Sequence, residues 1–276
     1  MAEFIFRGKP VHYEVYGEYG KPLLLLNGIM MSTKSWEPFV RSFSEKNVLI
    51  LVDFLDQGQS GRMEESYAQD IQAELVAELL ERLWYSQVSI MGISYGGEVA
   101  LQFALKYPER VERLILANTA SRTSDWLREI GHAWNAVASS GDGRAYYLTT
   151  IPVIYSTKFY EERLDWMKNR EKTLVPYFSN PEVLASLVRL TDSAEAYNVQ
   201  ARLGEITCPT LIISADADVL TPLTEQEILR AGIRGSKHAV IRESGHASMY
   251  EQPLLFASLV LGFVNAADTE FSIYRF

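Results

Sequence analysis

The chain has little of what a disulfide scaffold, a metalloprotein or a membrane protein needs. Cys208 is the only cysteine among 276 residues, which excludes an internal disulfide and favours a reducing compartment. The four histidines are scattered, with neither an HExxH pattern nor paired ligand spacing, so we expect no metal and no other cofactor. No apolar run reaches the roughly 18 residues of a spanning helix, and the N-terminal stretch lacks the apolar core of a signal peptide.

Basic charge is also scarce. The chain has 26 Lys and Arg against 35 Asp and Glu, which gives a formal net charge of -9. We expect neither nucleic acid nor an anionic membrane as a partner, because either would bind a basic patch and the sequence shows none. With 47% hydrophobic residues the chain can bury a full core. These features predict a soluble, cytoplasmic enzyme and leave its oligomeric state open.

Short apolar runs alternate with helical patterns in the first part of the chain. A hairpin is expected at the start, and helices are expected at 32–44 and 67–83. Strands are expected at 4–5, 11–16, 23–26, 48–52, 88–91 and 113–117. Such alternation implies right-handed crossovers and a mostly parallel sheet with helices on both faces.

The alternation stops between about residues 121 and 205, where helices are expected at 125–139, 159–172 and 181–201 and no strand is evident. The sheet then resumes with strands at 210–214 and 238–241, before a helix at 253–264 and a loose tail at 266–276. We therefore predict a core made of residues 1–120 and 206–276, with a helical lid at 121–205.

The predicted lid is rich in aromatic residues. Most of them would pack it onto the core, since large aromatic side chains dominate ordinary protein interiors. A minority should line a pocket, and we take Trp126 and Trp134 as candidates, together with Met30 of the core.

The stretch VSIMGISYGGEVALQFA, residues 88–104, joins a strand to a helix through a G-x-S-x-G element. In such an element the serine occupies a strained turn, and side chains two positions before and after it would collide with the opposing backbone. Those positions are Gly92 and Gly96. The following helix turns its N-terminal N–H groups toward the serine and favours negative charge there. Ser94 is thus a candidate nucleophile.

A serine hydroxyl is a weak nucleophile at neutral pH, so Ser94 needs a general base and an acid that orients the base. Asp218, in ADADVLTP, and His246, in ESGHASMYEQP, each follow one of the late predicted strands. The order Ser, Asp, His is the one expected on this architecture. Asp216 is the alternative acid, or else a turn residue whose carboxylate accepts backbone N–H groups.

Together these features resemble the α/β-hydrolase fold family over nearly the whole chain. The resemblance includes the hairpin start, a strand ending in Asn27-Gly28, a D-x-x-x-x-G-x-S run at 53–60, the serine turn and the late strands that carry acid and base. The carboxylesterase and enol-lactonase-like branches are most similar, because Asp218 lies four residues before Pro222. The resemblance implies an α/β-hydrolase fold with a helical lid.

In this family two backbone N–H groups hold the oxyanion that forms on acyl attack. One would be that of Tyr95, and by position the second is that of Ile29, with Met30 as the alternative. The chain departs from the family's common His-Gly at Asn27, which must replace the hydrogen bonds of a histidine. It departs again at Asp56, where glycine is frequent. Asp56 could touch substrate, but we expect a solvated turn carboxylate.

The resemblance implies acyl transfer. We expect a serine hydrolase that cleaves a carboxylic ester, lactone or thioester of a small to medium, largely apolar molecule. Serine in place of aspartate at position 94 excludes the dehalogenase and epoxide hydrolase branches, which attack through a carboxylate. An acyltransferase, a slow-turnover ligand sensor and a carbon–carbon hydrolase remain alternatives, because the fold hosts many activities.

Overall fold

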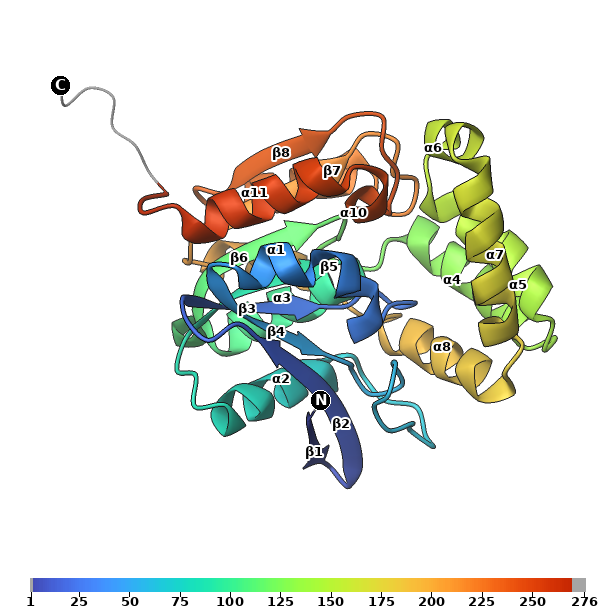
Figure 1. The fold of residues 1–276 in the computed structure, drawn as a ribbon, viewed down its shortest axis with the longest axis horizontal. Coiled ribbons are helices and arrows are strands. Elements are labelled where there is room, and N and C mark those ends of the chain that lie inside the picture. Colours follow the sequence, from blue (N-terminus) through green and yellow to red (C-terminus); the bar gives the residue numbers. More distant parts are fainter. Residues whose placement is uncertain (1, 270–276) are drawn as a thin grey trace.

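A computed structural model describes residues 2–269, and in this range eight strands form a single sheet (Figure 1). The strands are β1 (Ala2–Phe6), β2 (Lys9–Tyr16), β3 (Lys21–Leu26), β4 (Asn47–Val52), β5 (Val88–Ile93), β6 (Val111–Ala117), β7 (Thr210–Ala215) and β8 (Lys237–Ile241). Their order in the sheet is β1-β2-β4-β3-β5-β6-β7-β8. β1 and β2 form an antiparallel hairpin that joins β4, and every pairing from β4 to β8 is parallel. The predicted fold class is confirmed.

Helices cover both faces of the sheet. The helices, with 3₁₀ helices marked η, are η1 (Thr33–Phe39), α1 (Val40–Ser44), α2 (Asp70–Arg82), α3 (Tyr95–Lys106), η2 (Pro108–Arg110), α4 (Asp125–Ala138), α5 (Gly143–Ile154), α6 (Thr157–Glu162), α7 (Leu164–Phe178), α8 (Pro181–Ser193), η3 (Gln200–Glu205), α9 (Leu223–Gly232), α10 (Ser248–Glu251) and α11 (Pro253–Asn265). Successive strand side chains point to opposite faces, so Leu24 and Leu26 join the core under α2 and α3. Leu23 and Leu25 join a second core under η1, α1 and α11.

Several helices differ from the sequence predictions. The helix expected at 32–44 begins as η1, because Pro38 has no N–H to donate within an α-helix. The helix expected at 159–172 is two helices, α6 and α7, which meet at Arg163. α5 and α9 were not predicted. α5 contains β-branched residues and Pro152, and it is held by packing of Tyr146, Tyr147 and Ile151 rather than by propensity.

Five helices, α4 to α8, follow β6 and precede β7 in the described chain, and they lie together on the right of Figure 1. α4 packs on α5 and α8, and α7 packs on α5. Between residues 2 and 269, no helix has both the length and the apolar character that a membrane crossing requires. Residues 270–276 of the predicted tail lie outside the described residues.

Candidate active site

Ser94 occupies the sharp turn between β5 and α3. Its φ of 53° lies in the left-handed region, which costs a non-glycine residue on the order of 1–3 kcal/mol. Two hydrogen bonds to the segment around the end of β6 hold this conformation. The Ser94 N–H donates to the Ala117 carbonyl at 2.9 Å, and the Thr119 hydroxyl donates to the Ser94 carbonyl at 2.7 Å.

The two glycines of the turn leave no room for a side chain. A Cβ on Gly92 would lie 2.2 Å from the carbonyl oxygen of Gly96, and a Cβ on Gly96 would lie 2.3 Å from that of Leu26. Either substitution would force α3 away from the sheet. The close approach of the opposing backbone, which the G-x-S-x-G pattern predicts at both glycines, is therefore present in the structure.

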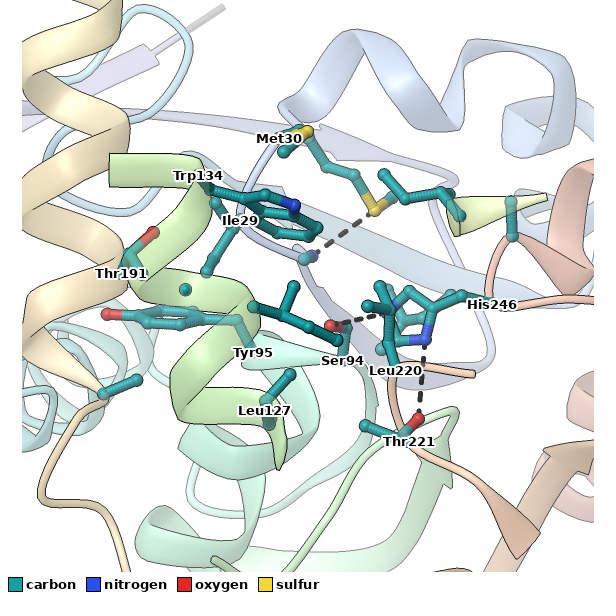
Figure 2. Close-up of a pocket in the computed structure, with 18 of the residues that line it drawn as sticks. Ile29, Met30, Ser94, Tyr95, Leu127, Trp134, Thr191, Leu220, Thr221 and His246 are labelled. Carbon is teal, nitrogen blue, oxygen red and sulfur yellow. Dashed lines mark hydrogen bonds between the residues drawn. The ribbon is translucent and has the colours of Figure 1, made fainter. Parts of the chain in front are cut away.

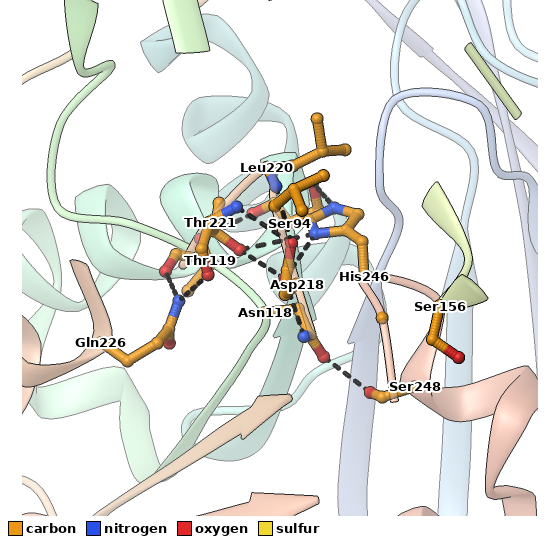
Figure 3. A network of polar contacts seen from close by, with 12 residues as sticks. Ser94, Asn118, Thr119, Ser156, Asp218, Leu220, Thr221, Gln226, His246 and Ser248 are labelled. Atoms are coloured by element: carbon orange, nitrogen blue, oxygen red, sulfur yellow. Dashed lines mark hydrogen bonds and ion pairs between the residues drawn. The ribbon is translucent and has the colours of Figure 1, made fainter. Parts of the chain in front are cut away.

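The structure brings Ser94, His246 and Asp218 into one hydrogen-bonded series (Figure 3). His246 Nε2 lies 2.8 Å from Ser94 Oγ, and His246 Nδ1 lies 2.8 Å from Asp218 Oδ2. A proton on Nδ1, donated to the carboxylate, leaves Nε2 free to accept the serine proton. The three side chains come from the ends of β5, β7 and β8, which meet at one edge of the parallel sheet.

Asp218 is buried among hydrogen-bond donors. Its Oδ1 accepts the N–H groups of Leu220 and Thr221, and its Oδ2 accepts the Asn118 amide and the Thr221 hydroxyl, at 2.9–3.0 Å. Burial alone would raise the pKa of Asp218, but His246 and these donors together hold that pKa below its ordinary value. The carboxyl is therefore charged at neutral pH and can orient the imidazole.

The sequence analysis did not identify Asn118 and Thr221 as partners of Asp218. Asn118 follows β6 directly, and the Ser248 hydroxyl donates to its side-chain oxygen at 2.6 Å. A polar residue at the end of a predicted parallel strand was the available signal. The alternative acid, Asp216, does not reach His246. Its carboxylate accepts the Glu243 N–H at 2.6 Å.

A cavity opens above Ser94 and His246. Ile29, Met30 and Tyr95 line it from the core, and Leu127 and Trp134 line it from α4 (Figure 2). Of the three predicted pocket residues, the structure places Met30 and Trp134 in this lining.

Trp126 lies elsewhere. Its side chain is 58% exposed, and its indole N–H donates to the Val219 carbonyl at 2.8 Å. Trp126 and Trp134 are eight residues apart in α4, so Trp126 lies about 12 Å along the helix axis from Trp134.

The two expected oxyanion donors, the N–H groups of Tyr95 and Ile29, lie in different parts of the backbone. Tyr95 is the first residue of α3, so its N–H has no carbonyl one turn back to bond with. Ile29 lies in the loop after β3, where Gln57 Nε2 donates to the Gly28 carbonyl at 2.8 Å. Asn27 anchors the start of that loop, because its amide donates to the Val52 carbonyl and its oxygen accepts the indole N–H of Trp36, both at 2.8 Å.

The expectation of a solvated carboxylate at Asp56 was wrong. The Asp56 side chain is fully buried and pairs with Arg189 of α8 at 2.5 Å. It also accepts the Met63 N–H at 3.2 Å. Asp56 is not part of the cavity lining, so it connects the loop after β4 to α8 rather than contacting a substrate.

Glu98, one turn into α3, is a cavity residue that the sequence analysis did not single out. Its side chain is only 4% exposed, and Gln69 Nε2 donates to its Oε2 at 2.6 Å. Burial raises the pKa of the Glu98 carboxyl to about 8. An acid in the first turn of a helix is usually a solvated partner of the helix dipole, so the sequence carried no signal of burial.

Comparisons with known proteins identify the family and the fold. The model of a family described as alpha/beta hydrolase fold matches residues 21–253. The crystal structure of MGS-M2, an alpha/beta hydrolase enzyme from a Medee basin deep-sea metagenome library, is 47% identical, with a TM-score of 0.97 over 99% of this chain and 100% of that one.

Two curated proteins are more distant. The 3-oxoadipate enol-lactonase 1 of Acinetobacter baylyi is 26% identical over 94% of this chain and 95% of its own length. RutD of Azorhizobium caulinodans, a proposed carbamate hydrolase, is 25% identical over 94% and 96%. The match over most of the chain, the fold and the serine turn lead to one conclusion: the chain belongs to the α/β-hydrolase fold family.

Proposed function

We propose that this protein is a serine hydrolase that cleaves a carboxylic ester, lactone or thioester through an acyl-enzyme intermediate. The observation that carries the proposal is the series of 2.8 Å contacts from Ser94 through His246 to Asp218 beneath an open cavity. Ser94 attacks the substrate carbonyl while His246 Nε2 takes its proton, and His246 then protonates the leaving alcohol or thiol. The same imidazole next activates a water that releases the acid.

The developing oxyanion would be held by the N–H groups of Tyr95 and Ile29. Preorganised donors of this kind stabilise acyl-transfer transition states by roughly 3–4 kcal/mol each. The position of Tyr95 at the start of α3 supports its role, because the helix dipole adds to the field at the same point. Met30, the next residue after Ile29, lines the cavity and is the alternative second donor.

We propose that residues 121–205 act as a lid over a core of residues 1–120 and 206–276. The lining supports this assignment, because α4 supplies Leu127 and Trp134 while the core supplies Ser94 and His246. The mostly apolar walls suit a small to medium substrate with a largely apolar acyl group. The relatives named for enol-lactone and carbamate hydrolysis support a carbonyl substrate with an oxygen or nitrogen leaving group.

The test is steady-state hydrolysis of p-nitrophenyl esters from acetate to decanoate by the wild type and by Ser94→Ala. We expect kcat to fall by about 10⁴ to 10⁶ in the variant. Ser139→Ala, at the exposed end of α4, is the control and should match the wild type. The acyl chain length with the highest kcat/KM indicates how long an acyl group the cavity accommodates.

Three other results would reject the proposal. Equal rates for Ser94→Ala and wild type would exclude the serine mechanism. A single burst of p-nitrophenol with no further turnover would indicate a ligand sensor, and ester formation from added alcohol that outpaces hydrolysis would indicate an acyltransferase.

A further inference from the structure

The Glu98 carboxyl is an unusual group for the wall of a mostly apolar cavity. Its Oε2 accepts from Gln69 Nε2, and the oxygen of Gln69 in turn accepts from Gln102 Nε2 at 2.6 Å. Within residues 2–269, no Lys, Arg or His side chain pairs with Glu98, and Gln69 is its hydrogen-bond partner. Burying a carboxyl group without a neighbouring cation costs folding free energy, so a buried carboxyl in a cavity wall is a candidate for a functional role.

The second oxygen, Oε1, is left to the cavity. Glu98 lines the same cavity as Ser94, and Oε1 is not among the side-chain polar atoms enclosed by protein without a partner. A molecule in the cavity can therefore reach Oε1. Because Glu98 is four residues beyond Ser94 along α3, its backbone lies about 6 Å further along the helix axis.

The protonation of Glu98 follows from its surroundings. Burial raises the pKa of this carboxyl to about 8, although the bond from Gln69 opposes the rise. At pH 7 the group is mainly a neutral acid. Since Oε2 accepts from Gln69, it acts as the carbonyl oxygen, and Oε1 carries the proton as a donor.

Other titratable groups surround this end of the cavity. Burial raises the pKa of the Tyr95 and Tyr197 hydroxyls, which face Glu98 from α3 and from the segment before η3, so both are uncharged. The lining also includes Arg128 and His132 from α4, Arg170 from α7, Asp192 from α8 and Glu195 just after α8. Arg128 pairs with Asp125, and His132 Nε2 lies 3.4 Å from Glu195 Oε1, so these side chains have partners other than Glu98.

The two sides of Ser94 differ in what they offer a substrate. Figure 2 shows His246 on one side of Ser94, and Tyr95 and Thr191 on the other. Glu98 belongs to the Tyr95 side, because its partner Gln69 donates its backbone N–H to the Ser193 carbonyl at 3.0 Å and Ser193 Oγ lies 2.9 Å from the Tyr95 hydroxyl. In the proposed mechanism His246 protonates the leaving group on its own side of Ser94, and we place the acyl group on the other side, toward Glu98.

Resting on the proposed function, we propose that Glu98 determines acyl specificity by donating its Oε1–H to an oxygen acceptor in the acyl chain. The substrate class is then an ester or lactone whose acyl part is apolar near the reacting carbonyl and carries a ketone, ether or second carbonyl oxygen several atoms further along the chain. Such a substrate binds better than a plain alkyl ester because it uses a buried donor that would otherwise be unpaired.

The experiment compares kcat/KM for p-nitrophenyl hexanoate and p-nitrophenyl 5-oxohexanoate, two esters of equal chain length. We expect the wild type to prefer the oxo ester at least tenfold at pH 7. Glu98→Met should abolish that preference, and Glu98→Gln, which keeps an N–H donor, should retain part of it. In Glu195→Gln, which alters another acid of the lining, the ratio should stay at the wild-type value.

The wild-type preference should also fall as the pH rises past about 8, because the carboxylate form has no proton to donate and repels the acceptor. Glu98→Gln should show no such fall. Equal kcat/KM for the two esters in the wild type, or an unchanged ratio in Glu98→Met, would overturn the assignment while leaving the serine mechanism intact.

A binding measurement keeps the test independent of turnover and of the proposed function. Titration of Ser94→Ala with methyl 5-oxohexanoate and methyl hexanoate should give about tenfold tighter binding of the oxo ester. The double variant Ser94→Ala, Glu98→Met should bind both esters equally. Equal binding by Ser94→Ala itself would reject the role of Glu98, even if the protein hydrolyses neither p-nitrophenyl ester.

Discussion

Two buried carboxyl groups, Asp218 behind His246 and Glu98 in the wall of the cavity, behave in opposite ways. Asp218 accepts four hydrogen bonds besides that of His246, and its pKa lies below the ordinary value. Glu98 accepts one, and its pKa is about 8. Burial disfavours charge at both positions, so the number of donors and the nearby imidazole decide the outcome.

This contrast separates two kinds of chemistry within one site. In the proposed mechanism the charged acid orients the general base, and in the proposed binding mode the neutral acid offers a donor to the substrate. Pairs of titratable groups whose surroundings push their pKa values apart are a common sign of divided roles in active sites. Three substitutions test this contrast between the two acids.

The largest effect is expected from Asp218→Asn, which keeps the shape of the acid but removes its charge. An amide can turn its N–H groups toward His246 and favour the wrong tautomer, so kcat should fall about 10⁴-fold. Asp216→Asn is the matched control, and its kcat should stay within a few-fold of wild type. A larger loss in Asp216→Asn than in Asp218→Asn would reverse the assignment of the acid.

An intermediate effect is expected on stability from Glu98→Gln. The folded protein keeps the Glu98 proton up to a pH of about 8, whereas the unfolded chain releases it near the ordinary value of 4.5. Raising the pH between these values therefore destabilises the wild type relative to the variant, by up to about 1.4 kcal/mol per pH unit.

Urea denaturation of both proteins at pH 5, 6, 7 and 8 measures this trend. The difference in unfolding free energy should shift steadily in favour of Glu98→Gln as the pH rises. A constant difference would mean that Glu98 is charged in the folded protein, and the contrast with Asp218 would disappear.

The smallest effect is expected from Asn118→Ala, which removes one donor from Asp218. The carboxylate keeps its other partners, so kcat/KM at pH 7 should fall by about tenfold or less. With one donor fewer, the pKa of Asp218 rises toward its ordinary value. Acid titration of the Asp218 carboxyl carbon by NMR in both proteins measures the shift, and no shift would show that Asn118 only supports the loop.

Much of the fold could be predicted from the sequence because local interactions determine it. Strand and helix periodicity predicted the sheet from 23–26 through 238–241, and backbone sterics predicted the glycines on either side of Ser94. His246 and Asp218 could be selected because parallel strands end at one edge of a sheet, where the structure brings their side chains together.

Other features depended on neighbours far away in the sequence. The sequence pattern indicates a turn residue at Asp56, yet its side chain is buried and forms a salt bridge with Arg189 of α8. Glu98 reads as a solvated acid of a helix N-terminus, yet α3 is enclosed and Gln69 is its hydrogen-bond partner. Helix α5 forms despite its composition, because its aromatic side chains are buried by other helices.

The sequence by itself determined the family, the strained serine turn and the order of the three candidate groups Ser94, Asp218 and His246, because these follow from short-range sterics and periodicity. Only the tertiary structure decided which tryptophan of α4 lines the cavity and which acid stays neutral. Burial and charge are properties of the whole surroundings of a side chain, and those surroundings are supplied by segments that the local pattern does not contain.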